Sequence, residues 1–354
     1  MRIAIRADAS EKIGHGHVMR CLTLASGLKA AGANVSLLSR NLPSELNAAV
    51  TQAQCRHYEL PEWLGNEWQD DILSSSKILS TQDPLDWLIV DHYGLDYKWE
   101  QQMRKYTKRI FVIDDLANRQ HLTDALLDPN YPADAAERYR EKVPANCLVL
   151  SGTTFVLLRE EFICARALNE NNDRTNLLVQ FGGADPTNCT AFTIRALAPL
   201  LSKGLPCDVV VGGAYTHLAD LHDLLHEYHF PKLNLHVATN DMARLISHAR
   251  LAVAGGGTSV WERCCLGLPS IVMAIAENQF KPLERLQETG AVKSLGYAHS
   301  VDPNQLVSEV EAIWCDSKQL QIMGEFGQAL VDGNGLRRVL DVITSEFSEL
   351  IVTN

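Results

Sequence analysis

The residues with the clearest capacity for chemistry lie close to the start of the chain. A short apolar strand beginning at Ile3 is followed by Arg6 and Asp8, and then by a glycine-spaced pair of histidines, His15 and His17. An imidazole has an unperturbed pKa near neutrality, so it can accept a proton from water without special tuning. In an open parallel sheet, ligands bind outside the carboxyl ends of the strands. We therefore expect these polar side chains to face a cleft.

The two histidines also have other interpretations. They could be metal ligands, but two imidazoles with one acid make an incomplete site, so we expect neither a metal nor any other cofactor. His15 is expected to pack or to donate to the backbone. His17, at a predicted helix start, could equally have a structural role, and residue type alone does not choose between that role and a general base.

A second group of residues, in the latter half of the chain, is suited to binding phosphate. Gly256, Gly257, Thr258 and Ser259 follow a predicted strand and open a helix. Backbone amides and hydroxyls in such a turn can cradle a phosphate group. Glu262, one turn further along, is placed to accept hydrogen bonds from two ribose hydroxyls.

Gly182 and Gly183 follow the first strand of the same half and are expected to line the same cleft. Tight turns also use glycine for steric reasons alone, but two such turns in one domain favour a nucleotide diphosphate as ligand. The first loop does not have a dinucleotide-binding pattern, because Met19 stands where the third glycine would follow Gly14 and Gly16. The chain also lacks the P-loop sequence of ATPases.

These loops require alternating strands and helices to position them, and the sequence predicts such an alternation throughout. Strands such as Leu88-Ile89-Val90 are continuously apolar, as expected where helices cover both faces of a parallel sheet. Three acids at strand ends, Asp91, Asp114 and Asp115, are interpreted as helix caps. The predicted strands begin at Ile3 and span 35–38, 87–91, 110–114, 176–181, 208–211, 234–237, 251–254 and 270–274, with helices at 17–31, 218–226, 242–248, from 259, and at 335–350.

A polar, asparagine-rich stretch around residues 165–174 indicates the boundary between two domains. We predict an α/β protein with two Rossmann-like domains facing a central cleft. The N-terminal domain, 1–168, carries the catalytic loop. The C-terminal domain, 174–336, binds the nucleotide, and a terminal helix occupies 337–354.

Composition excludes several functional classes. The chain has 354 residues, 46% of them hydrophobic and 21% charged, which is typical of a globular protein with two full cores. A formal net charge of -11 argues against nucleic-acid binding. Nine scattered cysteines indicate reduced thiols, and we expect neither a signal peptide nor a membrane span at the N-terminus. We therefore expect a cytoplasmic protein, and the composition is compatible with a monomer.

Several motifs resemble one known family, in order, from Ile3 to at least Gln279. These motifs read I-R-A-D-A-S, I-G-H-G-H-V-M-R-C-L-T-L-A, V-D-H-Y-G-L-D, I-D-D-L-A-N-R, Q-F-G-G-A-D-P, G-G-G-T-S-V-W-E-R-C-C-L-G-L-P-S and A-E-N-Q. The family is the UDP-2,4-diacetamido-2,4,6-trideoxy-β-L-altropyranose hydrolase of pseudaminic acid biosynthesis. It is similar to glycosyltransferases of the GT-B type, especially the lipid-II-forming N-acetylglucosaminyltransferase, and a sporulation-associated polysaccharide family has similar motifs.

The resemblance implies that water attacks the anomeric carbon of a UDP-sugar, with inversion and release of UDP. It also implies that His17 is the general base, that Tyr93 and Asn278, with Gln279 beside them, touch the sugar or its phosphates, and that the glycine turn and Glu262 hold UDP.

From the position of the first loop we assign Arg6, Asp8 and Gly14 to substrate binding, although Arg6 could instead pair with Asp8. Asp8 or a neighbouring acid is expected to orient the His17 ring. Three alternatives remain open at this stage: a glycosyltransferase of the same fold, a non-catalytic nucleotide-sugar binding protein, and an epimerising UDP-sugar hydrolase.

Overall fold

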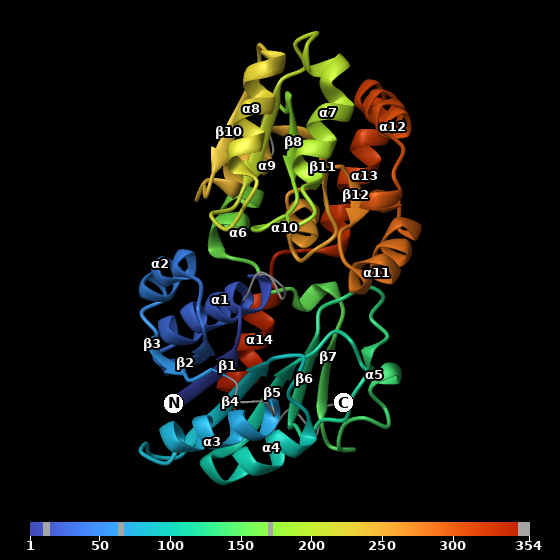
Figure 1. Cartoon of the computed structure of the whole chain (residues 1–354). Helices are drawn as coiled ribbons and strands as arrows, with labels where there is room; N and C mark the ends of the chain where they lie inside the picture. Colours follow the sequence, from blue (N-terminus) through green and yellow to red (C-terminus); the bar gives the residue numbers. More distant parts are fainter. Residues whose placement is uncertain (10–14, 63–66, 169–172, 346–354) are drawn as a thin grey trace. The chain divides into compact units, whose positions relative to one another are not determined.

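The computed structural model describes residues 1–9, 15–62, 67–168 and 173–345, and the chain divides into two compact units. Unit 1 comprises residues 1–157 and 334–354, and unit 2 comprises residues 158–333. Both units are made of parallel strands alternating with helices, as the sequence predicted (Figure 1).

Unit 1 is built on a seven-stranded sheet in the order β3-β2-β1-β4-β5-β6-β7, in which every pair of neighbouring strands is parallel. Because β1 lies between β2 and β4, the chain reverses its direction of sheet growth there, and ligands of open parallel sheets typically bind at such a point, outside the carboxyl ends of the strands. The elements are β1 (Arg2–Ala7), α1 (Gly16–Ala30), β2 (Asn34–Arg40), α2 (Ser44–Gln52), β3 (Arg56–Leu60), α3 (Glu67–Leu79), β4 (Leu85–Asp91), α4 (Tyr97–Met103), η1 (Arg104–Tyr106), β5 (Thr107–Ile113), β6 (Ala125–Asp128), α5 (Ala135–Arg138), β7 (Leu148–Ser151), η2 (Thr153–Phe155) and α14 (Gly335–Thr344).

Unit 2 is built on a six-stranded parallel sheet in the order β10-β9-β8-β11-β12-β13. The corresponding change of direction lies between β8 and β11. The elements are α6 (Glu160–Leu168), β8 (Asn176–Gln180), α7 (Cys189–Leu201), β9 (Cys207–Val211), α8 (Leu218–Tyr228), β10 (Leu233–Val237), α9 (Met242–His248), β11 (Ala249–Gly255), α10 (Ser259–Cys265), β12 (Ser270–Ala274), α11 (Glu277–Glu288), β13 (Val292–Tyr297), η4 (Ala298–Ser300), α12 (Pro303–Cys315) and α13 (Ser317–Leu330).

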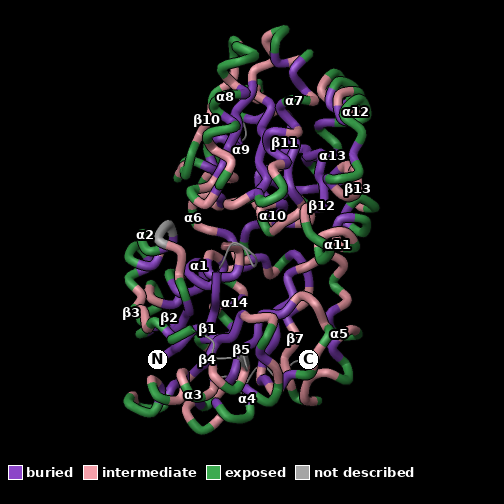
Figure 2. Tube along the Cα trace, viewed as in Figure 1, coloured by how far each residue is buried: buried purple, intermediate pink, exposed green. Residues whose placement is uncertain are grey.

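Side chains on both faces of each sheet are buried, which explains the continuously apolar strands. Along β4, Trp87 and Ile89 join the core under α1, α2 and α14, whereas Leu88 and Val90 join the core under α3 and α4. In unit 2, α7, α8 and α12 cover one face and α6 and α9 cover the other. Figure 2 shows the central strands of both units as the most completely buried segments, whereas the edge strands β3 and β10 are mostly exposed or half-buried.

The division of the chain differs from the expected domains at two places. The first unit ends at Leu157 rather than at 168, so α6 belongs to unit 2, where Phe162 is buried in the core with α9. The terminal helix α14 is not a separate element but part of unit 1. Its Ile343 is buried, and the indole of Trp87 donates a hydrogen bond to the Ile343 carbonyl at 3.0 Å.

Candidate active site

The candidate base, His17, lies in the first turn of α1, beside the end of β4. Its Nδ1 is 2.5 Å from Oδ1 of Asp91, the last residue of β4. A ring nitrogen that faces a carboxylate carries the hydrogen, so Nε2 keeps the lone pair that can accept a proton. Since the strand order reverses at β1 and β4, the pair stands where a ligand is expected.

A buried arginine, Arg20, completes this pair. It follows His17 by one helical turn, and its guanidinium contacts both carboxylate oxygens of Asp91, at 2.6 and 2.7 Å. Burial alone would raise the pKa of Asp91, but Arg20 and then His17 outweigh it and hold that pKa well below its usual range. Asp91 is therefore a permanent carboxylate, fixed in place to orient the imidazole. The sequence analysis did not single out Arg20, although a basic residue three positions after a candidate base on one helix is a signal that could have found it.

Tyr93 lies directly against the imidazole. Its ring packs edge-on against that of His17, with the centroids 4.5 Å apart, and its hydroxyl donates to Asp115 at 2.9 Å. Asp115 also lies 3.3 Å from Arg20. Burial raises the pKa of Tyr93, so this residue remains a neutral phenol. The structure thus brings Tyr93, predicted to touch the substrate, into the cluster of His17, Asp91, Arg20 and Asp115.

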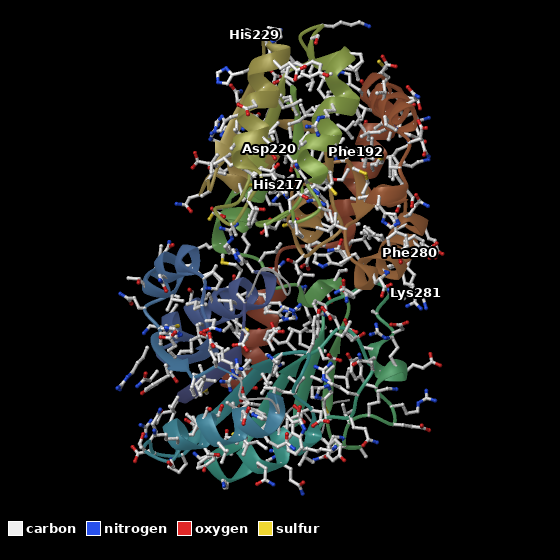
Figure 3. The ribbon with its side chains drawn as sticks, viewed as in Figure 1. Phe192, His217, Asp220, His229, Phe280 and Lys281 are labelled. Carbon is white, nitrogen blue, oxygen red and sulfur yellow. The ribbon has the colours of Figure 1, made fainter. Side chains whose placement is uncertain are left out.

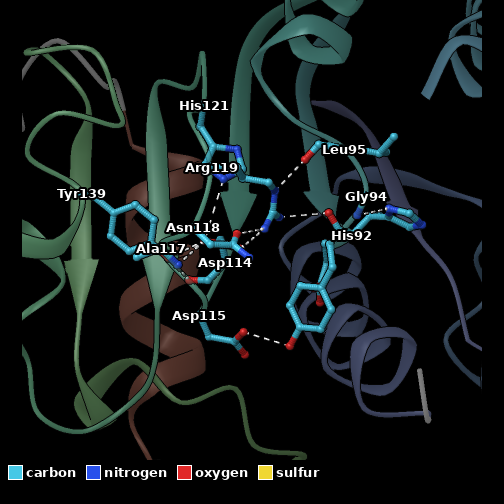
Figure 4. Close-up of polar contacts among 12 residues, drawn as sticks. His92, Gly94, Leu95, Asp114, Asp115, Ala117, Asn118, Arg119, His121 and Tyr139 are labelled. Carbon is cyan, nitrogen blue, oxygen red and sulfur yellow. Dashed lines mark hydrogen bonds and ion pairs between the residues drawn. The ribbon is translucent and has the colours of Figure 1, made fainter. Parts of the chain in front are cut away.

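Two loops are joined beside this cluster by Arg119 (Figure 4). Its guanidinium donates to the carbonyl of His92 at 3.0 Å and to that of Leu95 at 2.9 Å, and it pairs with Asp114 at 2.7 Å. His92 and Leu95 follow β4, whereas Asp114 follows β5. The segment that carries Tyr93 is therefore held by a side chain from the neighbouring loop.

The acids at the strand ends do not cap helices as interpreted from the sequence. Asp91 and Asp115 belong to the cluster around His17, and Asp114 accepts from the amide of Ala117 in the following turn at 3.0 Å. The helix after β4 is capped instead by Asp96, which accepts from the amide of Lys98.

Arg6 and Asp8, which we assigned to substrate binding, lie in a buried network of charges. Arg6 is fully buried and contacts Asp8 at 2.5 and 2.7 Å and Asp71 at 2.7 and 3.0 Å. Asp8 also accepts from the amide of Arg40 at 2.7 Å and lies 3.1 Å from His92. The charges of Arg6 and Asp8 are neutralised within this buried network, and Asp8 does not orient His17. Arg6 pairs with Asp8, as the alternative interpretation allowed.

The structure describes only some of the remaining residues of the first loop. Gly14, assigned to substrate binding, lies outside the described residues. The carbonyl of His15 accepts the amide of Met19 at 3.0 Å, at the start of α1. Over the described ranges, no three His, Cys, Asp or Glu side chains are grouped in a way that could hold a metal ion.

In unit 2, the predicted glycine turns follow β8 and β11, the two neighbouring strands at which the strand order reverses. Gly182 and Gly183 follow β8, while Gly256 and Gly257 follow β11 and lead into α10. A third glycine turn was missed. Gly212, after β9, lies so close to Gly183 that a Cβ added there would stand 2.2 Å from the Gly183 carbonyl oxygen. The pair Gly212-Gly213 directly after an apolar strand was the available signal.

Polar side chains lie beside the turn that follows β11. The Gln279 amide oxygen accepts from the amide of Ile275 at 3.0 Å, and its nitrogen would be 3.7 Å from a Cβ added at Gly257. Asn278 is exposed in the first turn of α11. Glu262 is half-buried, burial raises its pKa, and its carboxylate lies 3.6 Å from Arg159.

A separate hollow of about 390 Å³ lies in unit 2 between the start of α7, the β12–α11 connection and the end of β13. Its lining includes Phe192 on α7, labelled in Figure 3, together with Tyr297 and His299. None of the residues predicted to bind UDP lines this hollow.

Two parallel α/β units of this kind define the class of the fold, and comparison with solved structures places the chain in the GT-B fold. Acinetobacter baumannii MurG has a TM-score of 0.66 at 17% identity, covering 97% of this chain and 99% of that one. The calicheamicin glycosyltransferase CalG4 has a TM-score of 0.67 at 15% identity, covering 99% and 98%. The UDP-GlcNAc 2-epimerase of Neisseria meningitidis, solved with UDP-GlcNAc, has a TM-score of 0.63 at 12% identity, covering 97% and 99%.

No family model matches the chain. Two relatives with curated names are informative. The spore coat polysaccharide biosynthesis protein SpsG of Bacillus subtilis is 26% identical over 99% of this chain and 100% of its own length. The UDP-2,4-diacetamido-2,4,6-trideoxy-β-L-altropyranose hydrolase of Campylobacter jejuni is 30% identical over 53% of this chain and 62% of its own length. In the described ranges, no helix is both long and apolar enough to cross a membrane.

Proposed function

We propose that this protein hydrolyses UDP-2,4-diacetamido-2,4,6-trideoxy-β-L-altropyranose to UDP and the free sugar, with inversion at the anomeric carbon, as a step in pseudaminic acid biosynthesis. The observation that carries the proposal is the His17–Asp91 pair, an imidazole held by a buried carboxylate at the carboxyl edge of a parallel sheet. The name of the Campylobacter jejuni relative supports the choice of substrate.

In the proposed reaction, His17 is the general base. Its Nε2 takes a proton from water as the water oxygen forms a bond to the anomeric carbon, and the bond from that carbon to the diphosphate oxygen breaks. The departing UDP takes the bonding electrons. Asp91 stabilises the imidazolium that forms, because its charge is fixed by Arg20. Tyr93 contacts the sugar from its position against the imidazole.

Unit 2 is proposed to hold the nucleotide. The backbone of Gly182, Gly183, Gly256 and Gly257, with the hydroxyls of Thr258 and Ser259, would bind the diphosphate. Glu262 would accept hydrogen bonds from the ribose, and Asn278 and Gln279 would contact the sugar or its phosphates. Neither a metal nor a cofactor takes part in this proposal.

The test is UDP release from the diacetamido altrose nucleotide in ¹⁸O-labelled water, with no acceptor present. We expect ¹⁸O in the sugar, none in UDP, and an inverted anomer by NMR at early times. Label in the phosphate would show cleavage of the phosphorus–oxygen bond and would overturn the mechanism.

A glycosyltransferase is the second candidate, because a solved structure of this fold is a glycosyltransferase and the relative matched over its full length is named for polysaccharide biosynthesis. In that case an acceptor hydroxyl would replace water. UDP release would then be negligible until an acceptor is supplied. A protein that only binds nucleotide sugars would release no UDP under either condition.

A further inference from the structure

A buried arginine of unit 2, Arg263, lies beneath the glycine turn that follows β11. It is in α10 and is 0% exposed. Its guanidinium donates to the carbonyl of Gly255 at 2.9 Å, to the hydroxyl of Ser259 at 3.1 Å and to the hydroxyl of Ser270 at 3.2 Å. Two of these three acceptors, Gly255 and Ser259, stand at the two ends of the turn.

All three partners of Arg263 are neutral. In the described part of the chain, no carboxylate forms an ion pair with its guanidinium; the adjacent Glu262, whose charge favours the charged form of Arg263, has its carboxylate 3.6 Å from Arg159. Burial lowers the pKa of Arg263 to about 10, which leaves it charged at neutral pH. Removing a cation from water without a counter-charge is costly, so a buried arginine is ordinarily paired with an anion.

The hydrogen bond from Arg263 determines how the Ser259 hydroxyl can be used. A serine hydroxyl has one hydrogen and two lone pairs. Because one lone pair of Ser259 accepts from Arg263, the hydroxyl is fixed in place and polarised, and its own hydrogen is available to donate outward. Donation to an anion would be stronger than donation to a neutral group.

We propose that Arg263 is a positioning residue for the diphosphate of the nucleotide, supplying the buried positive charge that the anion neutralises and fixing Ser259 as a donor to it. This inference rests on the proposed binding of UDP at the glycine turn and adds a residue that lies below the turn, out of contact with solvent.

Another arginine in the same unit provides a matched control. Arg174 precedes β8 at the amino edge of the sheet, donates to the carbonyls of Ala249 and Leu266, and has a pKa that burial likewise lowers to about 10. It resembles Arg263 in donating to neutral groups but lies at the opposite edge from the glycine turn. Its removal reports the cost of losing a structural arginine.

The experiment compares the affinities for UDP and for uridine, which lacks the diphosphate, in the full-length protein by calorimetry. For Arg263→Met we expect UDP to bind about tenfold more weakly or worse, with uridine within about threefold of wild type, since a charge-assisted hydrogen bond contributes more than a neutral one. Arg263→Lys should recover part of the UDP affinity. Arg174→Met should leave the ratio of the two affinities unchanged.

Equal losses of UDP and uridine affinity in Arg263→Met would show a structural brace and overturn the proposal, as would unchanged UDP binding. If Arg263→Met does not fold, Ser259→Ala replaces it, with a several-fold loss for UDP alone as the expected result and no selective loss as the contradicting one. Failure of the wild-type protein to bind UDP would instead refute the proposed nucleotide site, and this inference with it.

Discussion

The candidate sites of the two units lie at the same topological position in their sheets, but they consist of different chemical groups. In unit 1 the site consists of charged side chains that hold one another, with Arg20 and His17 both on Asp91. In unit 2 it consists mainly of backbone, with glycines close to neighbouring chain segments. Handling a proton requires an ionisable group of fixed charge and orientation, whereas binding a diphosphate requires close approach to amide groups.

This difference predicts different sensitivities to mutation. Changes in the cluster of unit 1 should alter turnover and stability together, because each charge there depends on the others. Changes at the turns of unit 2 should alter nucleotide affinity, and should affect stability only where a new side chain meets a neighbour.

The largest effect is expected from Asp91→Asn. This change removes the carboxylate that orients His17 and leaves the buried Arg20 with Asp115, at 3.3 Å, as its remaining counter-charge. Turnover should fall by about 10²- to 10⁴-fold, as for loss of a general base, and the free energy of unfolding by about 3–5 kcal/mol. Steady-state kinetics and urea unfolding measure the two effects. Asp220→Asn, at an exposed position of α8, is the matched control and should change neither.

The next largest effect is a pH dependence of the free energy of unfolding, which we attribute to His121, two residues after Arg119. His121 is buried, with Nδ1 2.6 Å from Glu100 and Nε2 3.8 Å from Asp114. Although burial lowers it, these carboxylates raise the pKa of His121 from 6.5 to about 8. The protonated form therefore stabilises the fold, fully below pH 6.5, and this contribution is lost as the pH rises through about 8.

Unfolding free energies measured across that pH range should fall by on the order of 2 kcal/mol in wild type, since each pKa unit corresponds to about 1.4 kcal/mol. His121→Gln should flatten the dependence, whereas His222→Gln, at an exposed position of α8, should preserve it. An equal slope in wild type and His121→Gln would contradict this account of the cluster.

The smallest effect is expected in unit 2, where two adjacent glycines should separate binding from stability. A Cβ at Gly257 would meet Gln279 at 3.7 Å, an ordinary contact, while one at Gly256 would stand 2.3 Å from Leu283. Gly257→Ala should fold normally but bind UDP about tenfold more weakly, a loss of about 1.4 kcal/mol of binding free energy. Its turnover at saturating substrate should be retained. Gly256→Ala should unfold more easily, by about 1–3 kcal/mol. Calorimetry and urea unfolding of both variants test this, and equal UDP affinity in Gly257→Ala and wild type would count against the turn as a phosphate site.

The sequence predicted the alternating architecture well because apolar strands and helix periodicity are local signals. The positions of His17 and of the glycine turns after strands were also predicted, since each follows a recognisable apolar strand. Contacts between distant segments were not accessible. Asp71, which pairs with Arg6 in the buried network, lies 65 residues along the chain from it. The docking of α14 on unit 1 likewise depends on Trp87, which a local pattern does not reveal.

Asp91 shows most clearly what a local sequence pattern does not reveal. An acid at the end of a strand has a local interpretation as a helix cap, and only the parallel pairing of β1 with β4 brings it to His17. Short strands were missed for a related reason. β6 has four residues, Ala125–Asp128, too few for a pattern to stand out from its surroundings.

His17→Leu is the sharpest test of the proposal that unit 1 performs the chemistry while unit 2 holds the nucleotide. Turnover of the UDP-sugar and the dissociation constant of UDP should be measured on the same preparation, with folding confirmed by circular dichroism. We expect turnover to fall by about 10²- to 10⁴-fold, with UDP affinity essentially unchanged. Retained turnover in the folded variant, or a parallel loss of UDP binding, would contradict the proposal.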